Sequence, residues 1–216
     1  MNQYMYAYTF FCLTLTIIPT YTMQKTPKEL EAFFFDRKNW KDTNNIKNII
    51  NTTPQEILKN MTVPFFGTNL AHLAAENGDV SIMKLLLDKI QDPDKTWINQ
   101  SSTMEFTPLM LLFFKQSSNS TNMANIMLQH GADPNKMDSF GENALILAIT
   151  NGTPNIIKTM IEKYGADPDI HRQGKPTPRE LLIEKKLGYL VTKTAINNAI
   201  TNFARDLMVL TQILIK

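Results

Sequence analysis

The side chains most able to bind a metal or catalyse a reaction are few and far apart in this sequence. His72, His130 and His171 are widely separated, and Cys12 is the single cysteine. A structural zinc site needs several His or Cys ligands at short spacing, and an internal disulfide needs two cysteines. The sequence therefore predicts no metal site, no cofactor and no disulfide.

Two short acidic motifs, Asp92-Pro93-Asp94 and Asp167-Pro168-Asp169, each carry a pair of carboxylates. Neither motif has the Gly and the terminal Glu of a calcium-binding loop, so we interpret both as solvated turns. The chain also has no Gly-rich phosphate-binding loop and no Gly-x-Ser-x-Gly nucleophile motif. We predict that the chain is not an enzyme. The alternative is a small hydrolase whose site is assembled from residues distant in the sequence.

The composition is that of a folded protein of mixed charge. Of the 216 residues, 43% are hydrophobic and 19% are charged, which is enough apolar material for a buried core. The formal net charge is +2, and no long run of Lys or Arg occurs. Surfaces that bind nucleic-acid phosphates are strongly basic, so the sequence predicts no binding to nucleic acid.

The first 24 residues contain no charged side chain, and residues 10–18 form a short apolar run that Pro19 ends. We interpret residues 1–24 as a secretory signal peptide, because the run is shorter than the roughly 20 residues of a membrane-spanning helix. Cleavage would export the chain to the periplasm or the extracellular space. The run has no Lys or Arg before it, and its best cleavage site, Thr20-Tyr21-Thr22, is poor. An uncleaved membrane anchor and a buried N-terminal segment are therefore alternatives.

Three segments of the chain resemble one another, and a fourth resembles them in part. Their equivalent first residues are Gly67, Glu105, Gly141 and Gly174, at spacings of 38, 36 and 33 residues. A long connection before Glu105 and a short insertion near residues 117–120 account for the larger spacings. Repetition at such a period is typical of proteins built from small stacked units.

The motifs within these copies resemble those of the ankyrin repeat. The first copy contains Leu70-Ala71-His72-Leu73-Ala74, and the second contains Thr107-Pro108-Leu109. The second and third copies close with Gly131-Ala132-Asp133 and Gly165-Ala166-Asp167. The resemblance covers about residues 60–187. It implies an all-α solenoid of helix-turn-helix layers with finger loops, made of three clear repeats and a degenerate fourth.

Residues at the ends of the expected helices explain why each copy folds in this way. Thr107, which precedes a proline, and Asn143 can accept hydrogen bonds from the free N–H groups of a helix start. Gly78 and Gly152 can end the first helices in the left-handed conformation. A small residue such as Ala148 lets neighbouring first helices approach closely.

The segments that flank the repeats are expected to cap the stack. We predict an N-terminal helical cap over residues 25–60, repeats over residues 61–187 and an amphipathic capping helix over residues 188–216. Terminal units need such caps because their outer faces meet water. Residues 44–61 are alternatively a worn repeat, and the C-terminal helix is alternatively a docking element for a partner or a second copy.

The resemblance also implies a function. Ankyrin arrays bind other proteins through their finger tips and first helices, which together form a concave face. We predict that the chain is a monomer that binds another protein through this face, and that it is exported. The alternative is an intracellular or membrane-anchored scaffold, with membrane contact only through a retained N-terminal segment. The hydrolase alternative would use the same face. The residues that match these binding positions are Phe65, Phe66, Glu76, Asn77, Trp97, Met104, Phe106, Phe140, Glu142, Thr150, Asn151, Arg172, Gln173 and Lys175.

Three residues of the repeats, two of them in this list, have a structural interpretation. For Phe106 and Trp97, the alternative to partner contact is packing against the next finger, since aromatic side chains serve both purposes. His72 stands in the Thr-Pro-Leu-His position of the family. There the resemblance implies that the imidazole bridges neighbouring loops and takes no part in catalysis.

Overall fold

The computed structural model describes residues 25–116, 119–151 and 154–191. The expected signal peptide and most of the expected C-terminal capping helix lie outside these residues, as do Gly152 and part of the insertion near residues 117–120.

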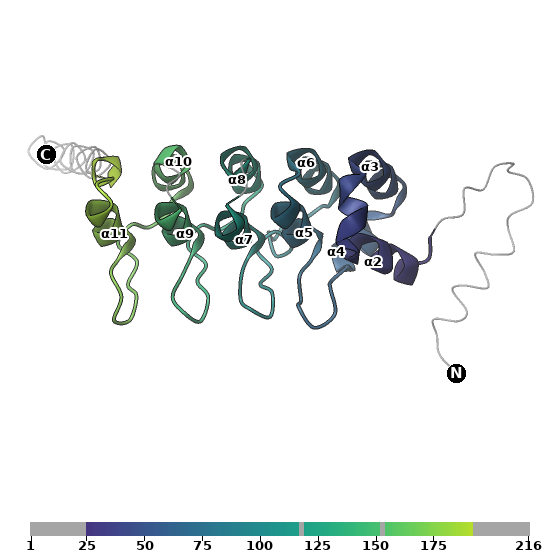
Figure 1. Cartoon of the computed structure of the whole chain (residues 1–216), viewed down its shortest axis with the longest axis horizontal. Helices are drawn as coiled ribbons and strands as arrows, with labels where there is room; N and C mark the ends of the chain where they lie inside the picture. Colours follow the sequence, from purple (N-terminus) through teal and green to yellow (C-terminus); the bar gives the residue numbers. More distant parts are fainter. Residues whose placement is uncertain (1–24, 117–118, 152–153, 192–216) are drawn as a thin grey trace, which may run out of the picture.

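The described residues form helices joined by long loops, and they contain no strand beyond one isolated antiparallel bridge between Thr62 and Asn69. The all-α prediction is therefore confirmed. Within the described part of the chain, no helix is long and apolar enough to cross a membrane. The elements labelled in Figure 1, with the short helix η1, are α2 (Pro27–Phe35), η1 (Arg37–Lys41), α3 (Thr43–Thr52), α4 (Gln55–Asn60), α5 (Leu70–Asn77), α6 (Val80–Lys89), α7 (Pro108–Lys115), α8 (Ser120–Gln129), α9 (Ala144–Thr150), α10 (Pro154–Tyr164) and α11 (Pro178–Glu184).

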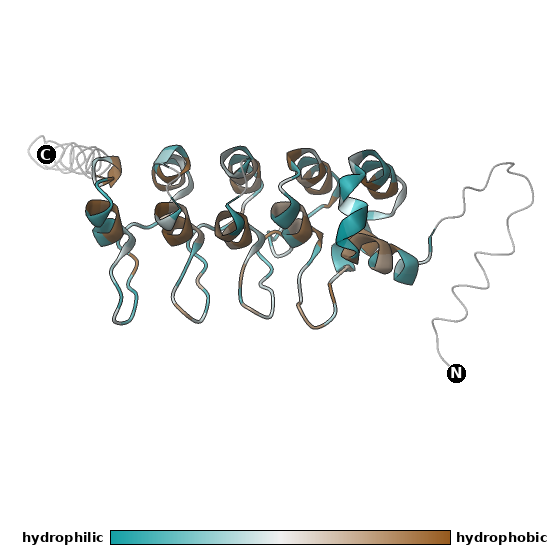
Figure 2. Ribbon diagram, viewed as in Figure 1, coloured by the Kyte–Doolittle hydropathy of each residue, from teal (hydrophilic) through white to brown (hydrophobic). Residues whose placement is uncertain are grey.

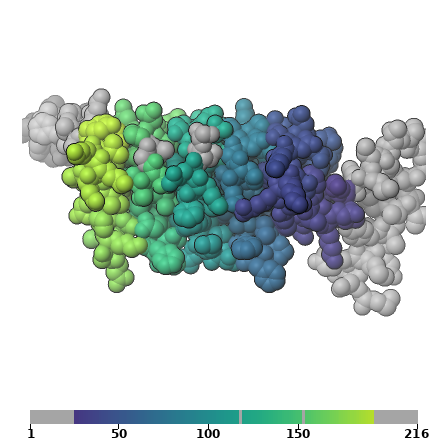
Figure 3. Space-filling view, in the orientation of Figure 1, coloured from purple at the N-terminus to yellow at the C-terminus, as the bar shows by residue number. Residues whose placement is uncertain are grey.

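The helices are arranged in an inner row and an outer row, as Figure 1 shows. In the inner row, α5, α7, α9 and α11 each contact the next helix, and in the outer row α3, α6, α8 and α10 do the same. The pairs α5–α6, α7–α8 and α9–α10 are three layers, and α11 begins a fourth. The sequence predicted three clear repeats and a degenerate fourth over these same helices. Successive colours follow one another along the molecule in Figure 3, as expected for layers that touch their neighbours.

Apolar side chains fill the space between the layers, and the helices carry much of the brown colour in Figure 2. Ala74, Leu112 and Ala148 occupy matching positions on the inner helices, and each is fully buried. One layer has too little apolar surface to form a core by itself. The stability of the array therefore depends on the contacts between layers.

The helices begin at the residues that the sequence predicted. The Thr107 hydroxyl accepts a hydrogen bond from the N–H of Met110 at 3.2 Å, and the Asn143 Oδ1 accepts one from the N–H of Ile146 at 2.9 Å. Gly78 ends α5 with φ of 70°, a left-handed conformation that glycine adopts without strain. These local contacts satisfy backbone groups that a helix end would otherwise leave unpaired.

Asn143 and Asn69 occupy the same helix-start position but differ in what their amide nitrogens contact. Asn69 Nδ2 donates to the carbonyl of Trp97 at 2.7 Å. Asn143 Nδ2 is buried and has no hydrogen-bond partner among the described residues. A buried donor without a partner costs about 1–3 kcal/mol. Thr107 shows that threonine fits this position.

We therefore expect opposite effects from the same substitution at these two positions. Asn143→Thr keeps the helix cap and removes the unpaired donor, so it should raise the free energy of unfolding by about 1 kcal/mol. Asn69→Thr leaves the carbonyl of Trp97 without its donor and should lower the free energy of unfolding by about 1–2 kcal/mol. Urea unfolding of both variants measures the change. A shift of both in the same direction would contradict the assignment of the unpaired donor.

The N-terminal segment closes one end of the array. Phe34 and Trp40 are buried, and the indole Nε1 of Trp40 donates to the carbonyl of Phe34 at 2.7 Å. Helix α3 packs against α6 in the outer row. Lys89 Nζ donates to the carbonyl of Asn51 at 2.7 Å and so joins α6 to the C-terminal end of α3. This segment thus covers the apolar face of the first layer.

Candidate protein-binding surface

Four finger loops project from the same side of the inner row (Figure 1) and share one backbone turn. The residues taken as equivalent in the sequence all have positive φ: 61° at Gly67, 60° at Glu105, 71° at Gly141 and 69° at Gly174. In the third finger the N–H of Gly141 closes the turn on the carbonyl of Asp138 at 3.0 Å. The alignment of the four copies is therefore correct at the finger tips.

The residue before the positive-φ position points into solvent in each finger. In the first three fingers this residue is apolar: Phe66 is 59% exposed, Met104 is 65% exposed and Phe140 is 71% exposed. Phe65, beside Phe66, is 95% exposed. We call Phe65, Phe66, Met104 and Phe140 the apolar tip row. In the fourth finger the corresponding residue is Gln173, which is also exposed.

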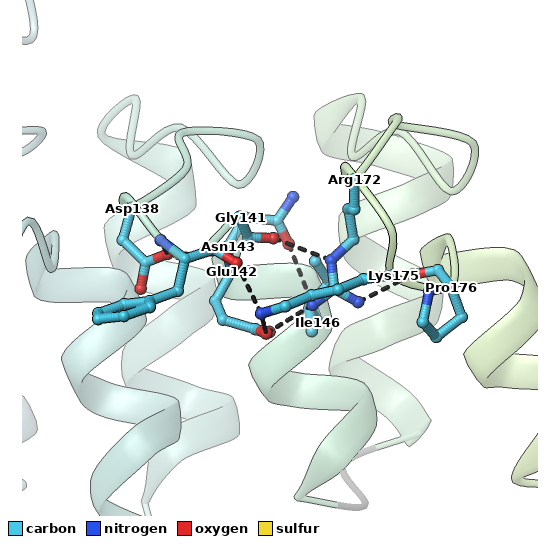
Figure 4. A network of polar contacts seen from close by, with 9 residues as sticks. Asp138, Gly141, Glu142, Asn143, Ile146, Arg172, Lys175 and Pro176 are labelled. Carbon is cyan, nitrogen blue, oxygen red and sulfur yellow. Dashed lines mark hydrogen bonds and ion pairs between the residues drawn. The ribbon is translucent and has the colours of Figure 1, made fainter.

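Arg172 joins the third finger to the fourth (Figure 4). Its guanidinium donates to the carbonyl of Gly141 at 2.9 Å, to the carbonyl of Pro176 at 2.8 Å and to the Glu142 carboxylate at 2.5 Å. Its side chain is 4% exposed. The prediction that Arg172 contacts a partner is therefore corrected, because the side chain is buried and each of its three nitrogens donates a hydrogen bond within the array.

Lys175 and Asp138 hold the tip of the third finger in place. Lys175 Nζ donates to the carbonyl of Phe140 at 2.7 Å and contacts the Glu142 carboxylate at 3.1 Å. The Asp138 carboxylate accepts from the N–H groups of Phe140 at 2.9 Å and Glu142 at 2.8 Å. Glu142 thus pairs with both Arg172 and Lys175. The side chain of Lys175 is 42% exposed. The phenyl ring of Phe140 is presented on a rigid support.

The first two finger tips are also bonded to each other. The N–H of Thr103 donates to the carbonyl of Phe66 at 2.9 Å, and Gln100 Nε2 donates to the carbonyl of Gly67 at 3.2 Å. Between the second and third tips the described residues make no hydrogen bond or ion pair. The finger tips are therefore bonded within a first pair and within a second pair, and the second and third fingers are joined at their bases.

Predicted contact residues at the C-terminal ends of the inner helices connect neighbouring layers. The Glu76 carboxylate lies 2.6 Å from the guanidinium of Arg37 and 3.0 Å from Lys115 Nζ, so it joins the N-terminal segment to the first two layers. Asn151 Oδ1 accepts from Gln116 Nε2 at 3.0 Å. These contacts are structural roles that the sequence did not reveal.

The remaining two predicted residues on the inner helices have exposed side chains. Asn77 donates to the carbonyl of Leu73 at 2.8 Å within its own helix. The backbone carbonyl of Thr150 accepts a hydrogen bond from Lys185 Nζ at 3.4 Å, and the side chain of Thr150 is exposed. Both side chains remain accessible to solvent at the C-terminal ends of their helices.

Trp97 is a further correction, because it is 3% exposed and part of the core. The backbone N–H of Trp97 donates to the Asp92 carboxylate at 2.9 Å, and this bond folds the long first connection back onto the array. Phe106 is half-buried, and its ring lies 5.4 Å from that of Phe114. Phe114 is 54% exposed and was not predicted. The sequence could have indicated Phe114, because it follows Phe113 in an expected helix and the side chain after a buried residue points away from the core.

His72 is fully buried and bridges two loops, as the resemblance implied. Its Nδ1 accepts from the N–H of Asn69 at 3.1 Å, and its Nε2 lies 2.9 Å from the carbonyl of Phe106. Burial lowers the pKa of the imidazole to about 4, whereas the hydrogen bond to Phe106 opposes that shift. Across the described residues, no group of His, Cys, Asp and Glu side chains is arranged to hold a metal ion.

Asparagines at the base of the fingers clamp one copy to the next. Asn99 Nδ2 donates to the carbonyl of Gly131 at 2.8 Å, and its Oδ1 accepts a backbone N–H of the same turn at 2.7 Å. Asn135 makes the same two bonds one copy later. In the last finger Asp169 stands in this place and pairs with Arg179 at 2.6 Å. In the last finger, an ion pair between Asp169 and Arg179 thus takes the place of the asparagine hydrogen bonds.

A comparison with protein families agrees with this architecture. The family model described as ankyrin repeats (3 copies) matches residues 38–138 and 72–173, which together span more than half of the chain. A search among curated proteins finds no significant match. Ankyrin repeats generally mediate interactions between proteins. From the shared turns, the stacked layers and this match, we conclude that the chain belongs to the ankyrin-repeat family.

Proposed function

We propose that this chain binds another protein through the apolar tip row. The observation that carries the proposal is the exposure of large apolar side chains on three consecutive fingers: Phe65, Phe66, Met104 and Phe140. Clustered exposed apolar residues mark interaction surfaces, and aromatic side chains often contribute most of the binding free energy. Phe114 adds an exposed ring on the inner row beside the half-buried Phe106.

The contacts beneath the row support the same proposal. Asp138, Lys175 and Thr103 fix the backbone of the tips through the hydrogen bonds described above. A surface that is already rigid loses little conformational entropy when a partner binds. The apolar tip row is therefore a preorganised surface.

Partner capture tests the proposal. The double variant Phe66→Ser/Phe140→Ser removes two exposed rings and should lower the amount of specifically captured protein at least about tenfold, because such residues carry hot-spot energies. Ile183→Ser is a matched control, since Ile183 is 62% exposed but lies on α11 outside the row. Circular dichroism verifies that both variants are folded. Equal recovery by the double variant and the native chain would reject the tip row.

We further propose that residues 1–24 direct export of the chain. The support is the sequence alone: an uncharged segment with a short apolar run ended by Pro19. Mass determination of the N-terminus of the natural product tests this. Loss of residues 1–24 supports export, and an intact N-terminus favours the anchored scaffold.

A further inference from the structure

We infer that the apolar tip row receives an amphipathic α-helix of the partner, whose apolar side chains are spaced two helical turns apart. This inference rests on the proposed function and specifies the shape and chemistry of what binds. It follows from the spacing of the row, from the state of its backbone groups and from the charge at one end.

The spacing of the row matches a helix. Phe66, Met104 and Phe140 occur once in each layer, at the same position of the shared turn. Packed helices lie about 8–10 Å apart, so the row repeats at roughly that distance. In an α-helix, residues i and i+7 lie on one face and are separated by about 10.5 Å. In a strand, residues on one face are only about 7 Å apart, which does not match one contact in each layer.

Three backbone groups of the described finger tips are already hydrogen-bonded within the array. The carbonyl of Phe66 accepts from the N–H of Thr103, and the carbonyl of Phe140 accepts from Lys175. The N–H of Phe140 is already bound to Asp138. An extended partner segment gains affinity by pairing with free backbone groups, whereas a helix brings its own backbone already paired. An extended segment would find these three groups already paired, whereas a helix needs none of them.

The charge at the fourth finger predicts in which direction the partner helix runs along the apolar tip row. Arg172 and Lys175 both contact the carboxylate of Glu142, and the Asp138 carboxylate is buried beneath the N–H of Phe140, so the most exposed charged group beside Phe140 is the ammonium of Lys175. The exposed ammonium of Lys175 is within reach of a partner that lies across Phe140. We expect acidic residues in the partner helix just beyond the apolar side chain that meets Phe140, because complementary charges orient a bound segment.

Synthetic helical peptides of about 20 residues test the inference with defined probes. The matched peptide has Leu at i, i+7 and i+14, and Glu residues after the last Leu. The control peptide has the same composition, with Leu at i, i+5 and i+10, which spreads the three side chains around the helix. A third peptide replaces the terminal Glu residues of the matched peptide by Gln. Fluorescence anisotropy of labelled peptides against the full chain gives the dissociation constants, up to about 1 mM.

The matched peptide should bind at least about tenfold more tightly than the control, and Phe66→Ser/Phe140→Ser should remove that difference. Glu should improve binding over Gln about threefold, and Lys175→Gln should abolish that advantage. Equal affinities of the matched and control peptides, or no binding of either, would overturn the inference. If binding by both peptides still depends on Phe66 and Phe140, the proposed function stands without the helix. The capture experiment judges that function separately.

Discussion

Replacing Ala148 by Arg will unfold the third layer and weaken both of its neighbours. Ala148 is fully buried on α9, which packs against α7 on one side and α11 on the other. An arginine there must place an unpaired charge and a long side chain into a space sized for one methyl group. We expect the free energy of unfolding to fall by at least about 4 kcal/mol, the usual scale for a buried uncompensated charge.

Urea unfolding and amide hydrogen exchange check this expectation. Protection should disappear first in α9 and α10, because an array loses stability through the interfaces of the altered layer. Thr150→Arg is the control: it introduces the same side chain on the same helix at an exposed position and should change stability by no more than about 0.5 kcal/mol. An unchanged urea midpoint in Ala148→Arg would show that the register of the layers is wrong.

Mild acid will destabilise the array through His72. Burial holds the pKa of His72 at about 4 in the folded protein, compared with 6.5 for an ordinary histidine. Between these values the unfolded chain takes up a proton that the folded chain does not. The contribution of His72 to the free energy of unfolding is therefore fully present above pH 6.5. It is lost as the pH falls toward 4, by about 3 kcal/mol in total.

The effect is measured as the free energy of unfolding at a series of pH values in this window. In His72→Gln the loss of stability between pH 6.5 and pH 4 should shrink by most of that amount, even though the variant is less stable at neutral pH. Comparing the two slopes separates His72 from the other titrating groups. Parallel curves for the native chain and the variant would mean that His72 takes up its proton without unfolding the protein.

The fold could be predicted because its determinants are local and repeated. Asn69, Thr107 and Asn143 begin helices through contacts with residues no more than three positions away. Gly67, Glu105 and their equivalents mark the turns by their place in each copy. A pattern that recurs in register identifies such contacts without any knowledge of the tertiary structure.

The candidate site was predicted less well because its contacts join different copies. Arg172 binds Glu142 across 30 positions of sequence, and Glu76 is paired with Arg37 at 39 positions. No local pattern distinguishes a charged finger residue that clamps the next finger from one that faces water. Trp97 was misassigned for a related reason: the long first connection has no counterpart in the other copies, so repetition gave no guide to where it folds.

The absence of a bond between the second and third finger tips in the described chain affects the mechanics of the whole array. Thr103 stiffens the junction on one side of this position, and Arg172 stiffens the junction on the other. The second and third fingers are joined at their bases instead, where Lys136 Nζ donates to the carbonyl of Asn99 at 2.6 Å and Asn99 Nδ2 donates to the carbonyl of Gly131 at 2.8 Å. A small change in the distance between Met104 and Phe140 therefore breaks no hydrogen bond between these two tips in the described chain, whereas a change between Phe66 and Met104 would strain the bond from Thr103 to Phe66.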